Sequence, residues 1–280
     1  MHPGPVNIRL ASFSLAIHAA EFGSSVQCSL DSTFLPYRCT CHTTDMTIRA
    51  GRIRPPSGKQ GVSFPTVGTC FPGNTGFTLV DNKSSARFDW SARTATVDLR
   101  ECARADARAA VVRAVKFVVC MLALEGGGLA LHASAIAKDS GSIARGIAFF
   151  GPSGAGKSTA ASLNQHPWTV VSDDFTVVLP HDSGFSFYAS PWSKPCSAPL
   201  DPREPVGLER LLLVQKAENN TISDMSPPQQ ITSVVSSTPT PPYSDAVAKQ
   251  LLVNAGNLCS HVPVGTLYFS NARPIDYLWK

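Results

Sequence analysis

The sequence lacks a long hydrophobic run and lacks an excess of charge of one sign. No stretch of about twenty apolar residues occurs, which is the length that a helix needs to cross a bilayer, and the longest apolar region, residues 115–124, is interrupted by Lys116. The 24 basic and 20 acidic residues leave a formal net charge of +4, and the basic residues are scattered singly. The composition therefore gives little support to a membrane role or to nucleic-acid binding.

Signals for secretion and for metal binding are also sparse. Residues 1–5 lack the basic flank and apolar core of a secretion signal, so we expect a cytoplasmic protein. Of the eight cysteines, only Cys39 and Cys41 lie close together, with His42 beside them. This C-x-C-H pattern lacks the second pair of ligands that a zinc site of the usual spacing requires. We therefore expect free thiols in a reducing compartment.

The length and the apolar content bound the architecture. A chain of 280 residues with 43% hydrophobic residues can bury a substantial core in one large domain or two smaller ones. Residues 1–103 are expected to form a β-rich region, because short apolar segments alternate there with turn residues. The predicted strands are residues 7–10, 46–49, 77–80, 87–90 and 94–99. We expect a small sheet here rather than an independent catalytic unit.

Residues 104–280 are expected to form a second domain of the α/β class. Apolar residues recur at spacings of three and four between Arg104 and Leu124, which predicts a helix that ends at the glycines 126–128. Residues 129–137, 145–150 and 169–171 are predicted strands. A helix separates the last two strands, so the pattern indicates a βαβ unit whose crossover favours parallel pairing.

The C-terminal part of this domain mixes clear and weak patterns. The segments 175–179 and 185–188 flank a turn and predict an antiparallel hairpin. Residues 218–243, rich in Ser, Thr and Pro, are expected to be the least ordered. The remaining predicted elements are a strand at 211–214, a helix at 246–258 and a strand at 265–270.

The most informative segment is residues 151–159, Gly-Pro-Ser-Gly-Ala-Gly-Lys-Ser-Thr, a complete G-x-x-x-x-G-K-S phosphate-binding pattern after a predicted strand. Glycines and small residues let successive backbone N–H groups turn inward around an anion. Lys157 adds a charge for the outer phosphates, and Ser158 adds a hydroxyl for the accompanying Mg²⁺. The expected nucleotide-binding residues are Gly151, Ser153, Gly154, Ala155, Gly156, Lys157, Ser158 and Thr159.

An acidic pair, Asp173 and Asp174, follows the predicted strand 169–171. Open α/β sheets bind their ligands at this end of a strand, and phosphoryl transfer needs both a metal ion and a carboxylate that orients the attacking hydroxyl. We expect Asp173 to be the base that orients the hydroxyl and Asp174 to bind Mg²⁺ together with Ser158, although the two aspartates could exchange roles. The alternative is a solvated turn.

Other nucleotide-related motifs are missing. No N-K-x-D run follows the loop, and no L-S-G-G-Q signature occurs, so a GTPase or a transport ATPase fits less well. His132 lies on an apolar predicted strand, and by itself it is typical of a hydrogen-bonded core histidine.

The segments Leu131–Ser134, Gly151–Thr159 and Val170–Asp174 together resemble the HPr serine kinase/phosphorylase family, and more closely its shorter HPr-kinase-like relatives. The resemblance implies a P-loop kinase core of the phosphoenolpyruvate-carboxykinase type with a mixed β-sheet. It also implies ATP with Mg²⁺ as cofactors and transfer of phosphate to a serine hydroxyl. His132 and Asp173 then correspond to active-site residues, and Lys157 and Ser158 to the phosphate-binding lysine and hydroxyl.

The expected function is that of an ATP-dependent serine kinase of the HPr-kinase-like kind. It would transfer the γ-phosphoryl group to a hydroxyl of a protein, peptide or small molecule, with Asp173, Lys157 and His132 as catalytic residues. The alternative is an ATP-binding regulatory module without turnover. No nucleic-acid or membrane partner is expected, and homo-oligomer formation stays open.

Overall fold

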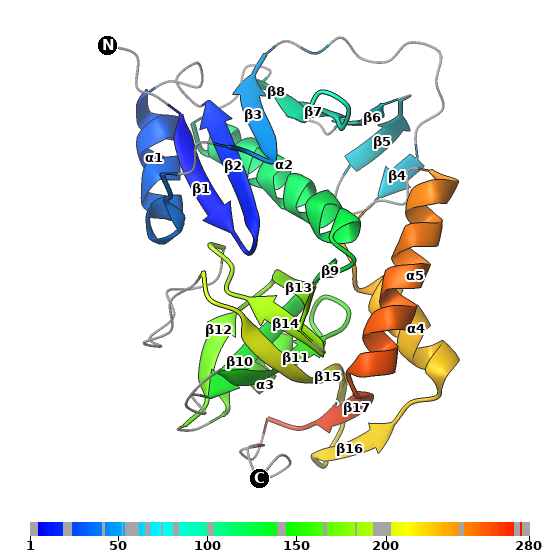
Figure 1. Cartoon of the computed structure of the whole chain (residues 1–280). Helices are drawn as coiled ribbons and strands as arrows, with labels where there is room; N and C mark the ends of the chain where they lie inside the picture. The colour runs from blue at the N-terminus through cyan, green and yellow to red at the C-terminus, as the bar shows by residue number, and fades with distance from the viewer. Residues whose placement is uncertain are drawn as a thin grey trace. The chain divides into compact units, whose positions relative to one another are not determined.

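The computed structural model describes residues 5–18, 24–40, 43–51, 53, 62–64, 68–73, 75–80, 84–99, 104–138, 144–164, 167–182, 184–192, 203–240, 244–271 and 275. The chain divides into two compact units, residues 1–122 with 240–248 and residues 123–239 with 249–280. Each unit contains one mixed β-sheet (Figure 1). The expected α/β class is therefore confirmed as a β-rich mixed α/β architecture, whereas the domain division at residues 103/104 stays a prediction.

The first unit is built on an eight-stranded sheet, larger than the small sheet that the sequence predicts. Its strands, in spatial order, are β1 (Val6–Leu10), β2 (Phe13–His18), β3 (Met46–Ala50), β8 (Thr94–Leu99), β7 (Ser84–Asp89), β6 (Gly76–Val80), β5 (Gly68–Pro72) and β4 (Val62–Phe64). Strand β3 is parallel to both of its neighbours, and the other neighbouring pairs are antiparallel.

Helix α1 (Ser24–Phe34), followed by the short helix η2 (Leu35–Tyr37), was not predicted. Its sequence is rich in serine and threonine, which are poor helix formers. The helix is nevertheless amphipathic, because Val26, Leu30 and Phe34 are spaced by four residues and are all buried.

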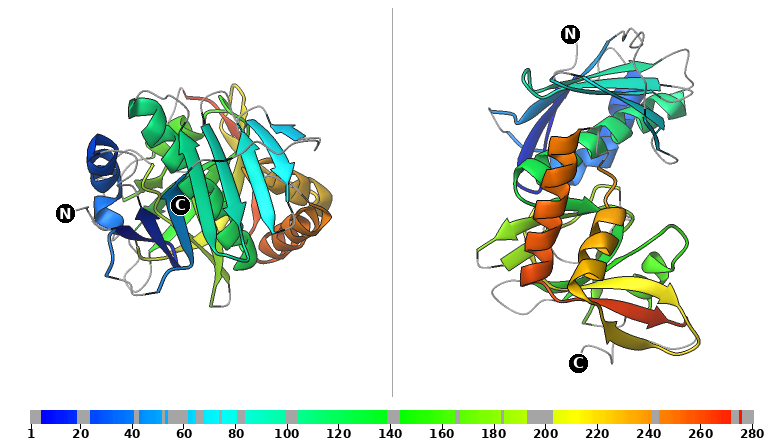
Figure 2. Two further views of the ribbon diagram at one scale, coloured as in Figure 1. Left: turned by 90° about the horizontal axis from the view of Figure 1, so that it is seen from above. Right: turned by 90° about the vertical axis from the view of Figure 1, so that its right-hand side faces the viewer.

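Helix α2 (Arg104–Glu125) confirms the predicted helix. The part that belongs to the first unit packs against its sheet (Figure 2). The ring of Phe117 lies edge-on to that of Phe88 on β7, with 6.2 Å between the ring centroids. The helix ends at the predicted glycines, where Gly127 has a φ of 77° and donates its N–H to the carbonyl of Leu124. No helix in the described ranges is both long and apolar enough to span a membrane, and the cytoplasmic location stays a prediction.

The second unit contains a nine-stranded sheet. The spatial order is β12 (Thr169–Ser172), β10 (Ala133–Lys138), β11 (Arg145–Phe150), β15 (Val206–Lys216), β14 (Gly184–Tyr188), β13 (Thr176–His181) and β9 (Leu129–Leu131), and β17 (Val264–Phe269) also pairs with β15 and with β16 (Thr221–Asp224). Strand β15 is parallel to β11 and to β17. The predicted hairpin is present as β13 and β14.

The predicted parallel pairing across the βαβ unit is wrong. Strands β11 and β12, joined through helix α3 (Lys157–Ser162), do run in the same direction, but β10 lies between them and is antiparallel to both. Strand β10 precedes β11 in the chain, and successive strands commonly pair as neighbours. This pairing occupies the edge of β11 that β12 would otherwise use.

The expectation that residues 218–243 are the least ordered is also wrong, since they contain β16 and helix α4 (Pro227–Ser236). The polar composition that suggested disorder includes a helix start: Ser226 and Gln229 form a capping box, and Pro227 follows the N-cap. Helix α5 (Asp245–His261) and β17 then confirm the predicted final helix and strand.

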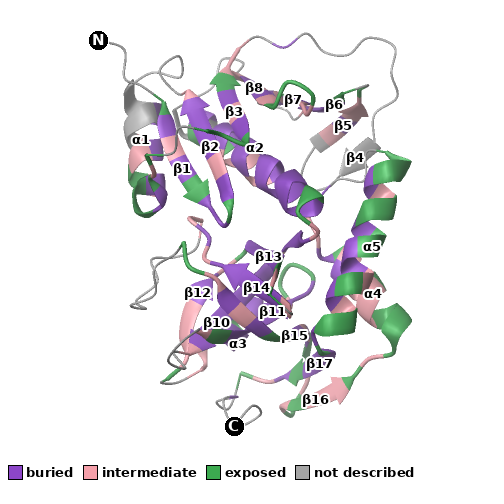
Figure 3. Cartoon of the chain, viewed as in Figure 1, coloured by how far each residue is buried: buried purple, intermediate pink, exposed green. Residues whose placement is uncertain are grey.

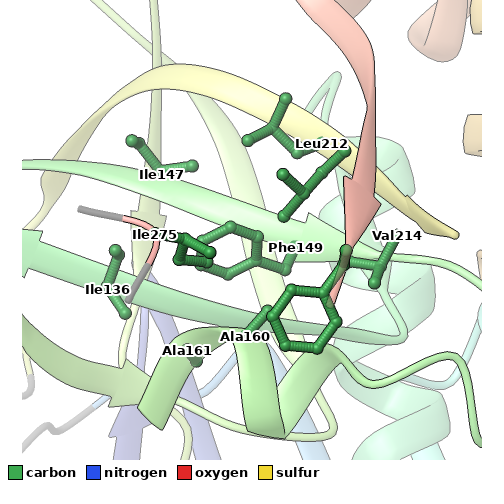
Figure 4. Packing of buried hydrophobic residues seen from close by; sticks show 10 residues of the cluster. Ile136, Ile147, Phe149, Ala160, Ala161, Leu212, Val214 and Ile275 are labelled. Carbon is green, nitrogen blue, oxygen red and sulfur yellow. The ribbon is translucent and has the colours of Figure 1, made fainter. Parts of the chain in front are cut away.

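One hydrophobic cluster of the second unit lies beneath helix α3. Figure 4 shows the buried side chains of β10, β11, β15 and β17 gathered against the helix. The cluster consists of Ile136, Ile147, Phe149, Ala160, Ala161, Leu212, Val214, Leu267, Phe269 and Ile275. Because its two members from α3, Ala160 and Ala161, have small side chains, the helix can pack closely on the strands.

Candidate functional site

The glycine-rich loop, residues 151–156, connects β11 to α3 as predicted. Gly151, Gly154 and Gly156 have φ values of 139°, 78° and 104°, which side-chain-bearing residues rarely adopt. The loop turns through a hydrogen bond from Ala155 N–H to the Pro152 carbonyl. A Cβ atom at Gly156 would lie 3.3 Å from the ring of Phe269, so this glycine also permits close packing on β17.

Lys157 is the buried charge of the site. Only 6% of its surface is exposed, and its ammonium group donates to the carbonyls of Gly151 and Pro152 at 3.1 and 2.9 Å. Burial lowers the pKa of Lys157 from its ordinary value, and the nearby carboxylates of Asp174 and Asp173 oppose this shift. The loop therefore holds a cation within electrostatic reach of both predicted aspartates.

Asp173 joins the loop to the neighbouring strand. Its Oδ1 atom accepts hydrogen bonds from Ser158 Oγ at 2.6 Å and from Ser134 Oγ at 2.5 Å. Ser134 lies on β10 and is completely buried. Because β10 pairs with both β11 and β12, the strand that separates these two also supplies the hydroxyl that contacts the aspartate at the end of β12.

Asp174 points to a different partner. Its Oδ1 atom lies 3.1 Å from Nε2 of His132, and the two side chains are 61% and 35% exposed. Asp174 has a φ of 70°, a left-handed conformation that aspartate adopts more readily than most residues. The two successive carboxylates therefore contact separate groups, Asp173 the hydroxyls of Ser158 and Ser134 and Asp174 the ring of His132.

Hydroxyls beneath this turn hold its backbone. Ser172 Oγ donates to the Phe175 carbonyl at 2.8 Å, and Thr176 Oγ1 donates to the Ala133 carbonyl at 3.0 Å. All four residues are buried. The acidic pair therefore stands on a hydrogen-bonded support rather than on a freely solvated turn.

His132 interrupts the strand that was predicted at residues 129–137. The structure has β9 before it and β10 after it, and the His132 backbone N–H donates to the Ser237 carbonyl at 2.8 Å. The half-exposed side chain lies at the acidic pair, which composition alone did not indicate.

The structure brings five of the predicted residues into one site: His132, Lys157, Ser158, Asp173 and Asp174. Ser153, Gly154 and Thr159 are exposed along the loop and the start of α3. Ser134 was missed as a site residue. The signal that could have identified it is a hydroxyl in an otherwise apolar strand two residues after the histidine.

The described residues of the site offer oxygen atoms, rather than a cluster of metal-ligating side chains, as possible ligands for a metal ion. Within the described ranges, no group of three or more His, Cys, Asp and Glu side chains could hold a metal ion. Cys41 and His42 of the C-x-C-H pattern lie outside those ranges, and Cys39 is half-buried. The hydroxyl of Ser158 and the carboxylates of the acidic pair are hard oxygen donors, which suit Mg²⁺ bound together with phosphate and water.

Comparison with known proteins assigns the family. The family model of the SynChlorMet cassette protein ScmC matches residues 97–270, more than half of the chain, and no curated protein matches. No family match supports the HPr serine kinase relation, so that predicted assignment is wrong. It rested on three short segments, and phosphate-binding loops of this kind recur in proteins of different families. The chain belongs to the family of the SynChlorMet cassette protein ScmC.

Proposed function

We propose that this protein is an ATP-dependent kinase that transfers the γ-phosphoryl group to a serine-type hydroxyl of a protein, peptide or small molecule, with Mg²⁺. One observation carries the proposal: the hydroxyl Oγ of Ser158, which follows the loop at the start of α3, is 2.6 Å from a carboxylate oxygen of Asp173, and the neighbouring residue is the buried Lys157. A loop hydroxyl and an acidic residue from another strand are the groups that phosphate-binding-loop enzymes use to hold a metal ion. The mixed sheet with the loop after β11 is compatible with a P-loop kinase core.

The loop and Lys157 would bind the triphosphate. An ammonium group has three N–H donors, and two of them are used on loop carbonyls. The third donor is available to a phosphate oxygen, and the carbonyl contacts keep the charge at the loop. Burial favours the neutral amine and the nearby carboxylates favour the cation, so a polyphosphate would add to the forces that keep Lys157 charged.

The hydrogen bond between Ser158 and Asp173 favours exchanging the roles first expected for the aspartates. Ser158 and Asp173 would hold Mg²⁺, directly or through water, and Asp174 would face the acceptor. Bound Mg²⁺ neutralises charge on the phosphates during transfer.

Asp174 and His132 would orient the acceptor hydroxyl. Both side chains are accessible, and their polar atoms lie within hydrogen-bond distance of each other. In the transfer the acceptor O–H bond breaks and its proton passes to the Asp174 carboxylate. A bond forms between the acceptor oxygen and the γ-phosphorus, and the bond between that phosphorus and the ADP oxygen breaks.

The direct test is incubation of the purified chain with γ-labelled ATP, Mg²⁺ and candidate acceptors. The matched family is described as a cassette protein, so the products of neighbouring genes are the first acceptors to examine. We expect label on a serine-type hydroxyl, a loss of transfer in Lys157→Ala and Asp174→Asn, and retained ATP binding in Asp174→Asn. An Asp174→Asn variant with normal transfer would refute the assigned base, and ATP binding without transfer to any acceptor would favour a regulatory module.

A further inference from the structure

In the sheet of the second unit, different strands lie on the two sides of the phosphate-binding loop. The strand order β12-β10-β11-β15, with β17 next to the last part of β15, puts the loop at the end of β11. The acidic pair lies on the β12 side, whereas the ends of the parallel strands β15 and β17 lie on the other side. If the terminal phosphate of a bound nucleotide faces Ser158 and Asp173, its nucleoside can extend toward β15.

A groove of about 460 Å³ is present on the β15 side. Its floor includes Leu213 and Gln215 of β15 together with Thr266 and Tyr268 of β17, and the register pairs Leu213 with Thr266 and Gln215 with Tyr268. The groove also extends over β16 to helix α4. Its volume lies within the usual range for small-molecule sites.

One residue that lines the groove also adjoins the phosphate-binding loop. Leu213 lines it, and the Leu213 Cδ1 atom lies 3.3 Å from the position of a Cβ atom on Gly151, the first glycine of the loop. Leu213 is also the register partner of Phe150, the last residue before the loop. One side chain therefore borders both the groove and the loop.

The side chains that helix α4 contributes to the groove are polar except for Pro228. Gln229, Thr232 and Ser233 share one helical face and line the groove, whereas Ile231 lies 3.9 Å from the Cβ position of Gly256 on α5. A helix that only covers a sheet presents apolar side chains to it. Figure 3 shows α4 and β16 mostly in the colours of half-buried and exposed residues, so apolar packing does not close this space.

The side chains around the groove match the chemistry of a nucleoside. Tyr268, which is 38% exposed, offers a ring for base stacking. The amide of Gln215 carries both donors and acceptors, as hydrogen bonding to a base edge requires. The carboxylate of Asp224 suits ribose hydroxyls.

We infer that this groove is the nucleoside subsite, which holds the base and ribose of the nucleotide whose phosphates lie in the loop. The inference rests on the proposed function, because it needs a triphosphate bound by residues 151–158. It assigns the two sides of the loop to different ends of the nucleotide: the β12 side to phosphoryl transfer and the β15 side to nucleoside binding.

The test compares two ligands by titration calorimetry on the full chain with Mg²⁺: ATP, and inorganic tripolyphosphate, which has no nucleoside. Wild type should bind ATP more tightly than tripolyphosphate. Tyr268→Ala and Gln215→Ala should weaken ATP binding, by about tenfold for the loss of stacking on Tyr268, and leave tripolyphosphate binding unchanged. Tyr268→Phe should keep the affinity for ATP. Leu252→Ala, at an exposed position on α5, is the control and should bind both ligands normally.

The outcomes separate the two proposals. If wild type binds neither ligand, the proposed function fails and the subsite fails with it. If wild type binds both ligands but the groove variants leave ATP affinity unchanged, or weaken tripolyphosphate equally, only the subsite is overturned. A groove variant that lowers phosphorylation of a peptide acceptor without changing ATP affinity would overturn it too, and would assign the groove to the acceptor.

Discussion

At the scale of single residues, one carboxylate oxygen, Asp173 Oδ1, connects two elements of the candidate site. Asp173 Oδ1 accepts hydrogen bonds from Ser158 at the start of α3 and from the buried Ser134 of β10, so two hydroxyls from separate elements set the direction of this carboxylate. We expect Ser134 to be a positioning residue that holds this carboxylate toward the loop, without contact to either substrate.

Ser134→Ala tests this role. A hydrogen bond to a charged group contributes about 1.5–3 kcal/mol, so kcat/KM for phosphoryl transfer should fall by roughly ten- to a hundredfold, and more Mg²⁺ should be needed for half-maximal rate. The measurement is transfer of labelled phosphate over a Mg²⁺ titration. The control is Ser162→Ala, which removes an exposed hydroxyl bonded to the Thr159 carbonyl. An unchanged Mg²⁺ requirement together with lower thermal stability would show that Ser134 is merely structural.

The thiols give a second prediction at this scale. Burial raises the pKa of Cys70 and Cys259 to about 11 and that of Cys120 to about 12. The reactive thiolate is therefore scarce at neutral pH. We expect Cys70 and Cys120 to resist maleimide at pH 7.5 in the folded chain and to react after denaturation in urea, as measured by peptide mass spectrometry. Rapid labelling of Cys120 under native conditions would contradict its burial.

At the scale of elements, the loop glycines differ in what a side chain at their position would contact. Gly154 and Gly156 both have positive φ values, but only at Gly156 would a Cβ press on the Phe269 ring; at Gly154 the added atom meets no described residue within 4 Å. Alanine at Gly154 would therefore introduce backbone strain alone, whereas alanine at Gly156 would introduce both backbone strain and a steric clash.

Gly154→Ala should cost about 1–2 kcal/mol of stability through backbone strain, whereas Gly156→Ala should cost more and weaken ATP binding further. Urea denaturation and titration calorimetry on both variants measure these effects. Equal losses in the two variants would show that the contact with Phe269 does not constrain the loop.

Helix α4 begins with a capping box, a local helix signal in a segment whose polar composition suggested disorder. The Ser226 backbone N–H and hydroxyl both donate to Gln229 Oε1, at 3.1 and 2.8 Å, as part of its capping box. Ser226→Ala should destabilise the helix by about 1 kcal/mol and speed amide exchange in its first turns by about fivefold. Hydrogen exchange followed by mass spectrometry measures this, with the amides of α2 as an internal reference. Unchanged exchange in α4 would show that tertiary contacts, rather than the cap, hold its start.

At the scale of the whole chain, the sequence predicted elements better than their arrangement. Strands with strong alternation, the helix at 104–125 and the loop at 151–156 follow from periodicity and from glycine chemistry, which act over a few residues. The insertion of β10 between β11 and β12 depends on which edges are free, and no local pattern records that. Ser134 escaped notice for the same reason: its partner lies 39 positions away.

The family assignment also belongs to this scale. Three short segments suggested an HPr-kinase relation, whereas the match over residues 97–270 identifies a different family, that of the SynChlorMet cassette protein ScmC. Phosphate-binding chemistry fixes only a few positions, so its motif carries little information about the rest of the chain. Lys157, Ser158, Asp173 and Asp174 could be proposed from the sequence because each has a separate chemical task that residue type and spacing indicate. His132 was proposed only through the family resemblance.

The left-handed torsion of Asp174 limits which amino acids this position accepts. Asparagine and glycine tolerate such a backbone, while glutamate would keep the negative charge but adopt the torsion less readily. Saturation mutagenesis at codon 174 should therefore recover well-folded chains with Asp, Asn or Gly before Glu. Glutamate is thus a poor substitute for Asp174, because the left-handed main-chain conformation, and not the chemistry of the carboxyl group, disfavours it.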